Sequence, residues 1–423
     1  MVEMKSPAVA FVGRHNSGKT TLIVKLIEEL VARGVDVGSV KHHSHAGFDI
    51  DIPGKDSYRH RHAGASETVI VAPGQMACVK TIEGDLDCSR IVASMPGHDL
   101  VIVEGYRKSG LPTIEIMRQG NPADVKAARV FAQGAREGWS LDSDFTQIGR
   151  RVSDADPGRI DYLDVSEKLP GSATVAIVSD IPCALEAARL YGIPSFGLES
   201  VSEIADFLER SYARPKVTVV IQAGGESRRM GTSKATVSFG GRPLICRLID
   251  RVSSVADELV ITTNEPDNLS FLLEDYPKLA IRLERDVCAA RGALPGLYTA
   301  LEVASHPYVA VVACDMIFAS PRLIAAEVEA LTRSGADAVV PVNKHGYEPF
   351  HALYRKSACL PVVREGVEAG QRAAQYVMRH VNVREFPQSE VLAAEPMGGC
   401  FVNANTPEEL ASFESWYLDA QHR

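Results

Sequence analysis

Residues 217–244 read VTVVIQAGGESRRMGTSKATVSFGGRPL, and this stretch decides how the second half of the chain is expected to fold. Its first five residues are apolar and mostly β-branched, which favours a strand buried on both faces of a parallel sheet. The segment from Gln222 to Gly225 follows at once, so the backbone can approach a ligand closely and offer its N–H groups to base or phosphate oxygens. After Pro243, apolar residues recur at helical spacing. The stretch therefore predicts a strand, a ligand-binding loop and a helix.

Three cationic side chains follow the glycine pair within seven residues, namely Arg228, Arg229 and Lys234. The glycines alone are equally typical of an ordinary strand-to-helix turn in a doubly wound domain. The added cations favour the other interpretation, a loop that holds a phosphorylated ligand.

The string A-G-G-x-S-R-R-M-G-x-x-K, followed by G-x-P-L, resembles the signature loop of the molybdenum cofactor guanylyltransferases, the MobA family. This family belongs to the sugar-nucleotide-type nucleotidyltransferases, and the resemblance covers residues 217–413. It implies that the loop wraps the base and triphosphate of an incoming nucleotide, with Lys234 on the phosphates. Gln222 stands where the family usually has leucine, and Ser233 where it usually has aspartate. These departures concern the base contacts more than the reaction.

The composition is typical of a globular protein of two or three domains, because 423 residues are too many for one core. Residues are 45% hydrophobic, 23% charged and 6% aromatic, and the formal net charge of -9 argues against a general nucleic-acid binder. No apolar run approaches the roughly 20 residues of a membrane span. The apolar run near the N-terminus is too short for a signal peptide. Neither nucleic acid nor a membrane is therefore an expected partner.

The eight cysteines are scattered without any C-x-x-C spacing, and several lie in apolar runs. This pattern predicts buried, reduced thiols in a cytoplasmic protein and indicates no zinc site. They are Cys78, Cys88, Cys183, Cys246, Cys288, Cys314, Cys359 and Cys400.

A second ligand motif lies near the N-terminus, where the apolar residues 8–12 precede GRHNSGKT at 13–20, a G-x-x-x-x-G-K-T pattern. Apolar residues between 22 and 31 repeat at helical spacing, and Gly34 is expected to end that helix. A strand, loop and helix in this order cradle phosphates at the helix N-terminus. Lys19 is expected to reach the β and γ phosphates, and Thr20 to hold Mg²⁺. The expected nucleotide-contacting residues are Gly13, Asn16, Ser17, Gly18, Lys19, Thr20 and Thr21.

The segment after the P-loop helix is predicted to form a second strand at 35–40, closing a βαβ unit, and then a polar loop. Five histidines between His42 and His62, together with Asp49 and Asp51, allow a transition-metal site as one interpretation. No fixed ligand spacing supports it. The other interpretation is a mobile switch-like loop near the nucleotide, in which Asp49 or Asp51 positions a water on Mg²⁺.

Residues 99–103, DLVIV, predict a further buried strand that ends at Glu104. An acid at such a strand end, in the same sheet as a P-loop, is expected to make a second contact with Mg²⁺ or its water; a surface turn is the alternative. The P-loop, the K-H-x-x-H…D-x-D-x-P-G-K-D-S run at 41–57 and V-I-V-E-G-Y at 101–106 resemble, in order, the MobB family. This family is the GTP-binding adapter of molybdopterin guanine dinucleotide synthesis, and the resemblance covers roughly residues 7–118.

The chain is expected to divide into residues 1–212, a linker at 213–216 and residues 217–423. A strand at 174–179 and a short helix at 201–210, capped by Ser202, are predicted near the end of the first domain. Residues 121–170 remain unassigned, with Trp139 as their only large anchor.

The second domain shows a strand and helix rhythm with predicted strands at 259–263, 280–283, 308–313 and 338–342. This predicts a Rossmann-like sheet without G-x-G-x-x-G, so a dinucleotide cofactor is not expected. The fold class is therefore α/β with two doubly wound domains, an N-terminal P-loop NTPase and a C-terminal Rossmann-like nucleotidyltransferase.

Three strand ends carry the remaining polar residues of this domain. Asp286 precedes a glycine turn at 292–296, and Asp315 follows a strongly apolar strand, where an acid is costly unless it meets a metal or donors. Asn403 and Asn405 precede T-P-E-E, a capping box with proline at the first helical position. Turn chemistry alone also explains the asparagines.

The resemblance to the guanylyltransferases implies Mg²⁺ at Asp315, a nucleotide contact by Asp286, and an acceptor-side role for Asn403 and Asn405. The family's asparagine after the second strand appears here as Thr262, with Asn264 two residues on. The expected nucleotide-binding residues are Gln222, Ala223, Gly224, Gly225, Gly231, Lys234, Thr262, Asn264, Asp286 and Asp315. The expected catalytic residues are Lys234, Arg228, Arg229 and Asp315, and the expected metal ligands Asp315, Thr20, Asp49 and Glu104.

The two resemblances together imply an enzyme that transfers GMP from GTP to molybdopterin and releases pyrophosphate, with one Mg²⁺ at each nucleotide site. The choice of guanine rests on the Gly224-Gly225 pair, because related cytidylyltransferases tend to carry A-A-G at this turn. A cytidylyltransferase, or a nucleotidyltransferase acting on another phosphorylated acceptor, remains the alternative.

The first domain can be a GTPase or a nucleotide-binding adapter. A further, nonenzymatic interpretation is that the whole chain is a scaffold that delivers cofactor to target enzymes. Expected protein partners are a molybdenum insertion protein and apo-molybdoenzymes or their chaperones.

Overall fold

The computed structural model describes residues 4–43, 51–143, 145, 168–224, 234–404 and 406–421. The chain divides into two compact units, Lys5–Arg214 and Pro215–Arg423, and the second unit also takes in Met4. The division lies within the segment 213–216 that the sequence predicts as a linker. Each unit has its own sheet and its own core.

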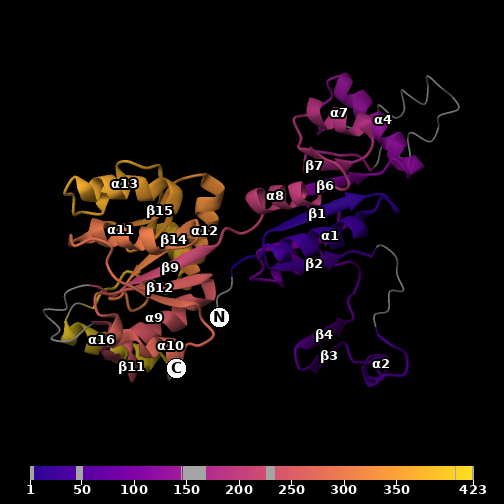
Figure 1. Ribbon diagram of the computed structural model, residues 1–423. Coiled ribbons are helices and arrows are strands. Elements are labelled where there is room, and N and C mark those ends of the chain that lie inside the picture. The colour runs from indigo at the N-terminus through magenta and orange to yellow at the C-terminus, as the bar shows by residue number, and fades with distance from the viewer. Residues whose placement is uncertain are drawn as a thin grey trace. The chain divides into compact units, whose positions relative to one another are not determined.

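The N-terminal unit is built on a parallel six-stranded sheet with the order β2-β5-β1-β6-β7-β8 (Figure 1). Its strands are β1 (Ala8–Gly13), β2 (Val37–Lys41), β5 (Leu100–Glu104), β6 (Thr113–Met117), β7 (Thr174–Ser179) and β8 (Ser195–Phe196). The predicted βαβ unit is present, but β5 lies between its two strands. Glu104 is therefore next to the strand that carries the P-loop.

Helices cover both faces of this sheet because neighbouring strand residues point to opposite sides. Val178 of β7 packs in one core with Leu26 and Leu208, whereas Ile177 packs in another with Phe131. The first face carries α1 (Lys19–Ala32) and α8 (Val201–Ser211), and the second α4 (Pro122–Arg136) and α7 (Pro182–Leu190). The described part of the unit also contains a short helix α3 (Cys88–Ala93), a helix α2 (Asp56–His62) and a separate hairpin of β3 (Glu67–Ala72) and β4 (Gln75–Lys80).

Two sequence predictions in this unit are wrong in detail. Phe131 of α4 is fully buried, so Trp139 is not the only large anchor in the segment that the sequence left unassigned. Ser202 does not cap α8, because the helix follows Ser200 and the Ser202 hydroxyl accepts a hydrogen bond from Arg33 at the end of α1 (2.8 Å).

The C-terminal unit has a mixed eight-stranded sheet in which β13, β12, β9, β14, β17, β15 and β16 lie in this order and β18 pairs with β15. The strands are β9 (Val217–Gln222), β12 (Glu258–Thr262), β13 (Ile281–Glu284), β14 (Tyr308–Ala313), β15 (Ala338–Asn343), β16 (Gly346–Tyr347), β17 (His351–Arg355) and β18 (Val383–Pro387). The first four in space are parallel, as predicted. β17 is antiparallel to both of its neighbours and was not predicted.

This sheet is also covered on both faces, so the doubly wound prediction is confirmed (Figure 1). Ile221 packs toward α9 (Leu244–Val252) and α12 (Pro321–Ser334), while Val220 packs toward α11 (Ala293–Val303) and α13 (Lys356–Glu368). The unit also contains β10 (Ser238–Phe239), β11 (Arg242–Pro243), α10 (Phe271–Asp275), α14 (Gln375–Met378), α15 (Gln388–Ala394) and α16 (Pro407–Gln421).

The predicted capping box and the cysteines are both described by the structure. The capping box before α16 is confirmed, since Thr406 and Glu409 each accept a hydrogen bond from the other's backbone N–H at 3.2 Å. All eight cysteines are free thiols, as predicted, but Cys78 is exposed and not buried, because it lies on the separate β3–β4 hairpin. Among the described helices, none has the length and apolar character needed to cross a bilayer.

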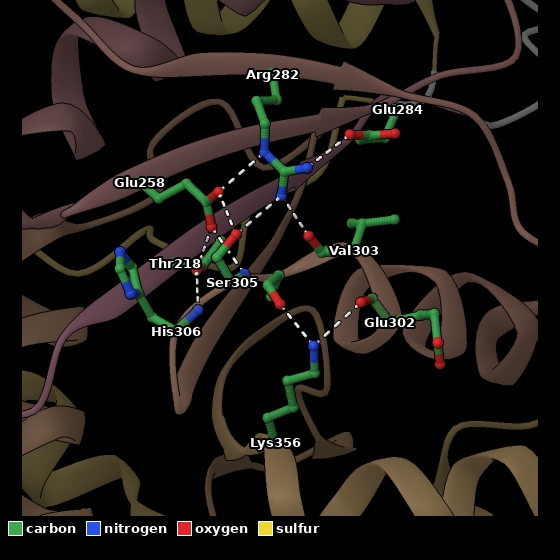
Figure 2. A network of polar contacts seen from close by, with 10 residues as sticks. Thr218, Glu258, Arg282, Glu284, Glu302, Val303, Ser305, His306 and Lys356 are labelled. Carbon is green, nitrogen blue, oxygen red and sulfur yellow. Dashed lines mark hydrogen bonds and ion pairs between the residues drawn. The ribbon is translucent and has the colours of Figure 1, made fainter.

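The amino ends of the strands in the C-terminal unit are joined by a network centred on Glu258 (Figure 2). Its carboxylate accepts hydrogen bonds from Thr218 (2.7 Å), from the Ser305 backbone N–H (2.9 Å) and hydroxyl (2.8 Å), and from Arg282 (2.9 Å). Lys356 donates to the carbonyls of Glu302 (3.1 Å) and Ala304 (2.6 Å) at the end of α11. These contacts tie three strands and a helix end together at the edge where Glu258 begins β12.

We predict that Glu258→Gln destabilises the protein at neutral pH. Burial by itself would raise the pKa of Glu258, but hydrogen bonds from Thr218 and Ser305 and the charge of Arg282 lower it from 4.5 to about 2. The ionised carboxylate thus contributes stability above pH 4.5, and this contribution disappears as the pH falls toward 2. Unfolding measurements should show a loss of about 1–3 kcal/mol at pH 7 that vanishes near the lower pKa.

A matched control for this prediction is Glu284→Gln. Glu284 accepts from the same Arg282 (2.7 Å), but its side chain is 34% exposed against 10% for Glu258. Solvent screening should limit its loss to less than about 1 kcal/mol. Equal losses for the two variants would contradict the special role of Glu258.

Candidate functional site

A cavity of about 590 Å³ opens where β9, β12 and β14 end. Ligands of α/β sheets bind at the carboxyl ends of parallel strands, so this is the expected edge. Predicted site residues that line the cavity are Gln222, Ala223, Gly224, Lys234, Thr262, Asn264, Asp286, Asp315 and Asn403. The fold thus brings together side chains from the whole length of the C-terminal unit.

Backbone hydrogen bonds carry the strand register past the ends of the strands. Thr262 and Ala313 both lie beside Gln222 in the sheet. The N–H of Ala223 then donates to the Thr262 carbonyl (2.8 Å), and the N–H of Cys314 donates to the Gln222 carbonyl (3.0 Å). The start of the glycine loop and Asp315 are therefore held next to each other.

Lys234 and Asp315 form an ion pair in this cavity, with 3.2 Å between the ammonium nitrogen and a carboxylate oxygen. Because Asp315 follows a strongly apolar strand, the sequence predicted that its carboxylate needs a metal or a hydrogen-bond donor. The Lys234 ammonium is such a donor. The two side chains are 25% and 26% exposed, so both remain within reach of a ligand. A phosphate group can therefore compete with Asp315 for the lysine.

The Asn264 amide donates to a carboxylate oxygen of Asp286 (2.8 Å), and both residues line the same cavity. A methyl group added at Gly224 would lie 3.6 Å from atoms of both side chains. The glycine thus leaves the polar pair open toward the loop backbone. Thr262, by contrast, is almost fully buried, so Asn264 is the more accessible of the two residues that the sequence considered.

Asn403 lies near Asp315, because it pairs with Met316 in an isolated antiparallel bridge and the next residue, Ala404, donates its N–H to the Asp315 carbonyl (3.1 Å). Gly225, Arg228, Arg229, Gly231 and Asn405 were also predicted for this site and lie outside the described residues. Their roles stay predictions.

Two charged residues that the sequence did not indicate also line the cavity. They are Arg291, at the start of the glycine turn, and Glu348, whose pKa is raised by burial while Asn343 donates to it (2.6 Å). Neither follows an apolar strand, which was the signal used for Asp286 and Asp315. Arg291 adds a cation to a chain with a net charge of -9.

The P-loop of the N-terminal unit has the backbone geometry of a phosphate-binding loop. Asn16 and Gly18 have positive φ angles of 63° and 87°, and Gly18 directly precedes α1. A methyl group at Gly13 would lie 2.6 Å from the Ile116 carbonyl oxygen, so the loop leaves β1 at a point that admits only glycine. Lys19 folds back onto the carbonyls of Gly13 (3.1 Å) and Arg14 (2.6 Å), and burial lowers its pKa.

Thr20 and Glu104 meet beside this loop, with 2.8 Å between the threonine hydroxyl and a carboxylate oxygen. Hydroxyl and carboxylate oxygens are ligands that suit Mg²⁺, so this pair fits the metal expected there. The side chain of Glu104 is 14% exposed and also pairs with Lys41 (3.4 Å), which is unlike an isolated acid of a surface turn.

Of the histidines and aspartates predicted after β2, His45 and Asp49 lie outside the described residues, and their roles stay predictions. Asp51 accepts hydrogen bonds from the Ser57 hydroxyl (2.9 Å) and the Ile52 N–H (3.0 Å). His42 pairs with Asp85 (2.9 Å) at the rim of a cavity of about 860 Å³ that also includes Gly13. Within the described part of the chain, no three His, Cys, Asp or Glu side chains are grouped as a metal site.

Comparison with known proteins relates each unit to a family. Residues 219–384 match the MobA-like NTP transferase domain. The molybdenum cofactor guanylyltransferase of Desulfosudis oleivorans is 35% identical over 200 residues, which are 47% of this chain and 95% of that protein. The probable molybdenum cofactor guanylyltransferase of Natranaerobius thermophilus is 31% identical over 194 residues, 46% of this chain and 93% of that protein. The chain belongs to the MobA family.

The N-terminal unit of this MobA-family chain carries a second match, because residues 8–132 fit the model for molybdopterin guanine dinucleotide synthesis protein B, MobB. The molybdopterin-guanine dinucleotide biosynthesis adapter protein of Escherichia coli is 38% identical over 118 residues, 27% of this chain and 67% of that protein. Both resemblances seen in the sequence are therefore confirmed.

We predict that Gly292→Ala weakens nucleotide binding in the MobA-like domain. Gly292 has a φ of 141°, and an added methyl group would lie 3.0 Å from the Arg372 carbonyl, which also binds the first turn of α11. The change should displace the loop that carries Asp286 and Arg291 and raise the dissociation constant about tenfold. Titration in a Lys19→Ala background, which removes the other phosphate site, measures this.

Gly335→Ala is the control, since Gly335 also has a positive φ of 64° but faces open space at the end of α12. It should cost about 1 kcal/mol of stability and leave the affinity unchanged. A Gly292→Ala protein that binds nucleotide as well as the control would show that the loop position is unimportant.

Proposed function

We propose that the chain transfers GMP from GTP to the terminal phosphate of molybdopterin, forming molybdopterin guanine dinucleotide and pyrophosphate. The observation that carries this proposal is the meeting of the 222–224 loop, Lys234, Asp286 and Asp315 in one cavity of a MobA-family nucleotidyltransferase domain. The relatives named as molybdenum cofactor guanylyltransferases support the choice of reaction.

The transfer requires an oxygen of the acceptor phosphate to attack the α-phosphorus of GTP. A bond forms between these atoms, the bond to the oxygen that bridges the α and β phosphates breaks, and pyrophosphate leaves with that electron pair. The acceptor oxygen is already anionic at neutral pH, so no general base is needed. The difficulty is to bring two polyanions into line, which positioning and local cations accomplish.

The residues of the cavity divide this work between them. The backbone at Ala223 and Gly224 approaches the nucleotide, and Lys234 exchanges its contact with Asp315 for the phosphates. The carboxylate of Asp315 would hold Mg²⁺, whose preferred ligands are oxygens, and Asp286, which lines the same cavity, contacts the nucleotide. Bound Mg²⁺ would supply charge neutralisation at the phosphates. Asn403, beside Asp315, lies on the acceptor side, where we also place Asn405.

Guanine is the proposed base because Gly224 leaves space in front of the Asn264–Asp286 pair. A side chain at that position would occupy part of the room in which a base edge can reach these polar atoms. Arg228 and Arg229 are proposed to neutralise charge on the departing pyrophosphate, together with Lys234.

We predict that Asp315→Ala lowers the rate of GTP-dependent pyrophosphate release by about 10²- to 10³-fold, because one preorganised contact at the reacting phosphates is lost. The assay contains the purified chain, Mg²⁺ and molybdopterin, with GTP or CTP as the nucleotide. Asp267→Ala is the control, since Asp267 is exposed and does not line the cavity.

The outcomes of this assay separate the alternatives. Release from CTP rather than GTP would mean a cytidylyltransferase with the same chemistry. No release from either nucleotide would point to another phosphorylated acceptor. Equal rates for Asp315→Ala and the unaltered chain would contradict the role given to Asp315.

For the N-terminal unit we propose GTP binding at the P-loop, with Thr20 and Glu104 holding Mg²⁺ and Asp49 or Asp51 positioning a water. Lys19→Ala should lower GTP affinity at this site at least tenfold, because a phosphate contact by a half-buried cation is removed. Titration of the full chain measures this, with Lys25→Ala, an exposed change on the same helix, as control.

A measurement of GTP hydrolysis decides whether the N-terminal domain is a GTPase or a nucleotide-binding adapter. A sizeable GTPase rate that Lys19→Ala abolishes would establish an enzyme. GTP binding that raises the yield of dinucleotide without turnover would establish an adapter. Unchanged GTP binding in Lys19→Ala would contradict both.

The remaining proposals concern the surroundings of the chain. Residues 1–212 and 217–423 act as modules joined by the linker 213–216, which raises the effective concentration of each for the other. A molybdenum insertion protein and apo-molybdoenzymes or their chaperones are the proposed protein partners, and the cytoplasm is the proposed location.

A further inference from the structure

The strands on the two sides of the P-loop strand β1 end in different polar groups, and this difference fixes the orientation of a bound nucleotide. Glu104, at the end of β5, contacts the Thr20 hydroxyl (2.8 Å) on one side of β1. This side therefore takes the metal and the terminal phosphate. The nucleoside must extend the other way, over the ends of β6 and β7, which follow β1 on its opposite side.

The loop after β6 is bonded to the P-loop on that side. The Asn121 amide donates to the His15 carbonyl (2.9 Å), and the Asn121 oxygen accepts from the Ala123 N–H (3.1 Å) as the cap of α4. Two residues earlier, the Gln119 N–H donates to a carboxylate oxygen of Asp180 (2.5 Å). Asp180 directly follows β7 and is exposed. Its carboxylate is thus held in place by the segment that also contacts the P-loop.

Strand spacing gives the distance between these groups. Parallel neighbours lie about 4.8 Å apart, so the end of β7 is about 10 Å from the end of β1. This separation is comparable to the span from the β-phosphate of a nucleotide to the far edge of its purine. Asp180 is therefore placed to meet the base of a nucleotide whose phosphates lie on the P-loop.

A carboxylate can only accept hydrogen bonds, which restricts the base that it can read. Guanine presents two donors side by side, the N1–H and the 2-amino group, whereas adenine presents an acceptor at N1. We propose that Asp180 accepts both donors of guanine and makes the P-loop site selective for guanine nucleotides. This inference rests on the proposed GTP binding by the N-terminal unit and names the residue that selects the base.

Two other polar side chains at these strand ends, Ser179 and Asn121, already have partners. The Ser179 hydroxyl accepts from the Ile181 N–H (3.0 Å), and both ends of the Asn121 amide are used as described above. The Asp180 carboxylate shares one oxygen with the Gln119 N–H and keeps further lone pairs for a ligand.

The test is Asp180→Asn in the full chain, with GTP and XTP as probes in the presence of Mg²⁺. Xanthine has a carbonyl in place of the 2-amino group, so an asparagine amide can donate to it and still accept from N1–H. Binding at the P-loop is taken as the component that Lys19→Ala removes, because the MobA-like domain also takes GTP. We expect GTP to bind about 10- to 100-fold more weakly and XTP to gain by a similar factor.

Two controls accompany this exchange. Asp180→Ala should weaken GTP binding without strengthening XTP binding. Glu199→Gln removes one negative charge from an exposed side chain just after β8, one strand farther along the sheet, and should change neither affinity. The asparagine keeps the oxygen that accepts from Gln119, so the loop itself should stay in place.

Each outcome has a separate meaning. Lys19-dependent GTP binding with an unchanged preference in Asp180→Asn would overturn this inference and leave the proposed function intact. Loss of GTP affinity in Asp180→Asn without any gain for XTP would also overturn base reading by Asp180. An absence of Lys19-dependent GTP binding in the unaltered chain would overturn the proposed function and this inference together.

Discussion

The parallel pairing of β9 with β14 is the constraint on which the candidate site of the MobA-like domain depends. These strands are more than 80 residues apart in sequence, yet Gln222 and Ala313 are neighbours in the sheet. The bond from the Cys314 N–H to the Gln222 carbonyl then carries the pairing into the loops. Because of this register, the glycine loop and Asp315 open into the same cavity, where Lys234 meets the acid.

The charged side chains at the two edges of this sheet differ in how fully they are paired within the protein. At the amino edge, Glu258 is saturated with donors and pairs with Arg282, so its charge is satisfied within the protein. At the carboxyl edge, Lys234 and Asp315 are each about a quarter exposed and can exchange partners. The first arrangement holds the strands together, and the second leaves charge available for a ligand. A protein of net charge -9 needs such local cations to bind a triphosphate.

In the N-terminal unit, too, the order of the strands places polar side chains around a glycine-containing loop. The P-loop leaves β1 at Gly13, and groups from β5 on one side and from β6 and β7 on the other face the space above it. Thr20 with Glu104, and Asp180 held by Gln119, therefore lie on opposite sides of the phosphate loop. A nucleotide laid across these strands contacts both, which gives the sheet order a direct functional meaning.

The sequence by itself predicted the two glycine-containing loops, most of the strands of the two large sheets and most of the residues that line the cavity, because each is encoded in contiguous residues with a local chemical pattern. It did not reveal β6 or β17, the burial of Phe131 in the core beneath α4, or the contact of Ser202 with Arg33. Nor did it show that Asn264 pairs with Asp286, that Arg291 and Glu348 line the cavity, or that Gln119 holds Asp180. The tertiary structure decided these features, since strand order and the contacts between distant residues depend on how the whole sheet packs, which local hydrophobic spacing does not encode.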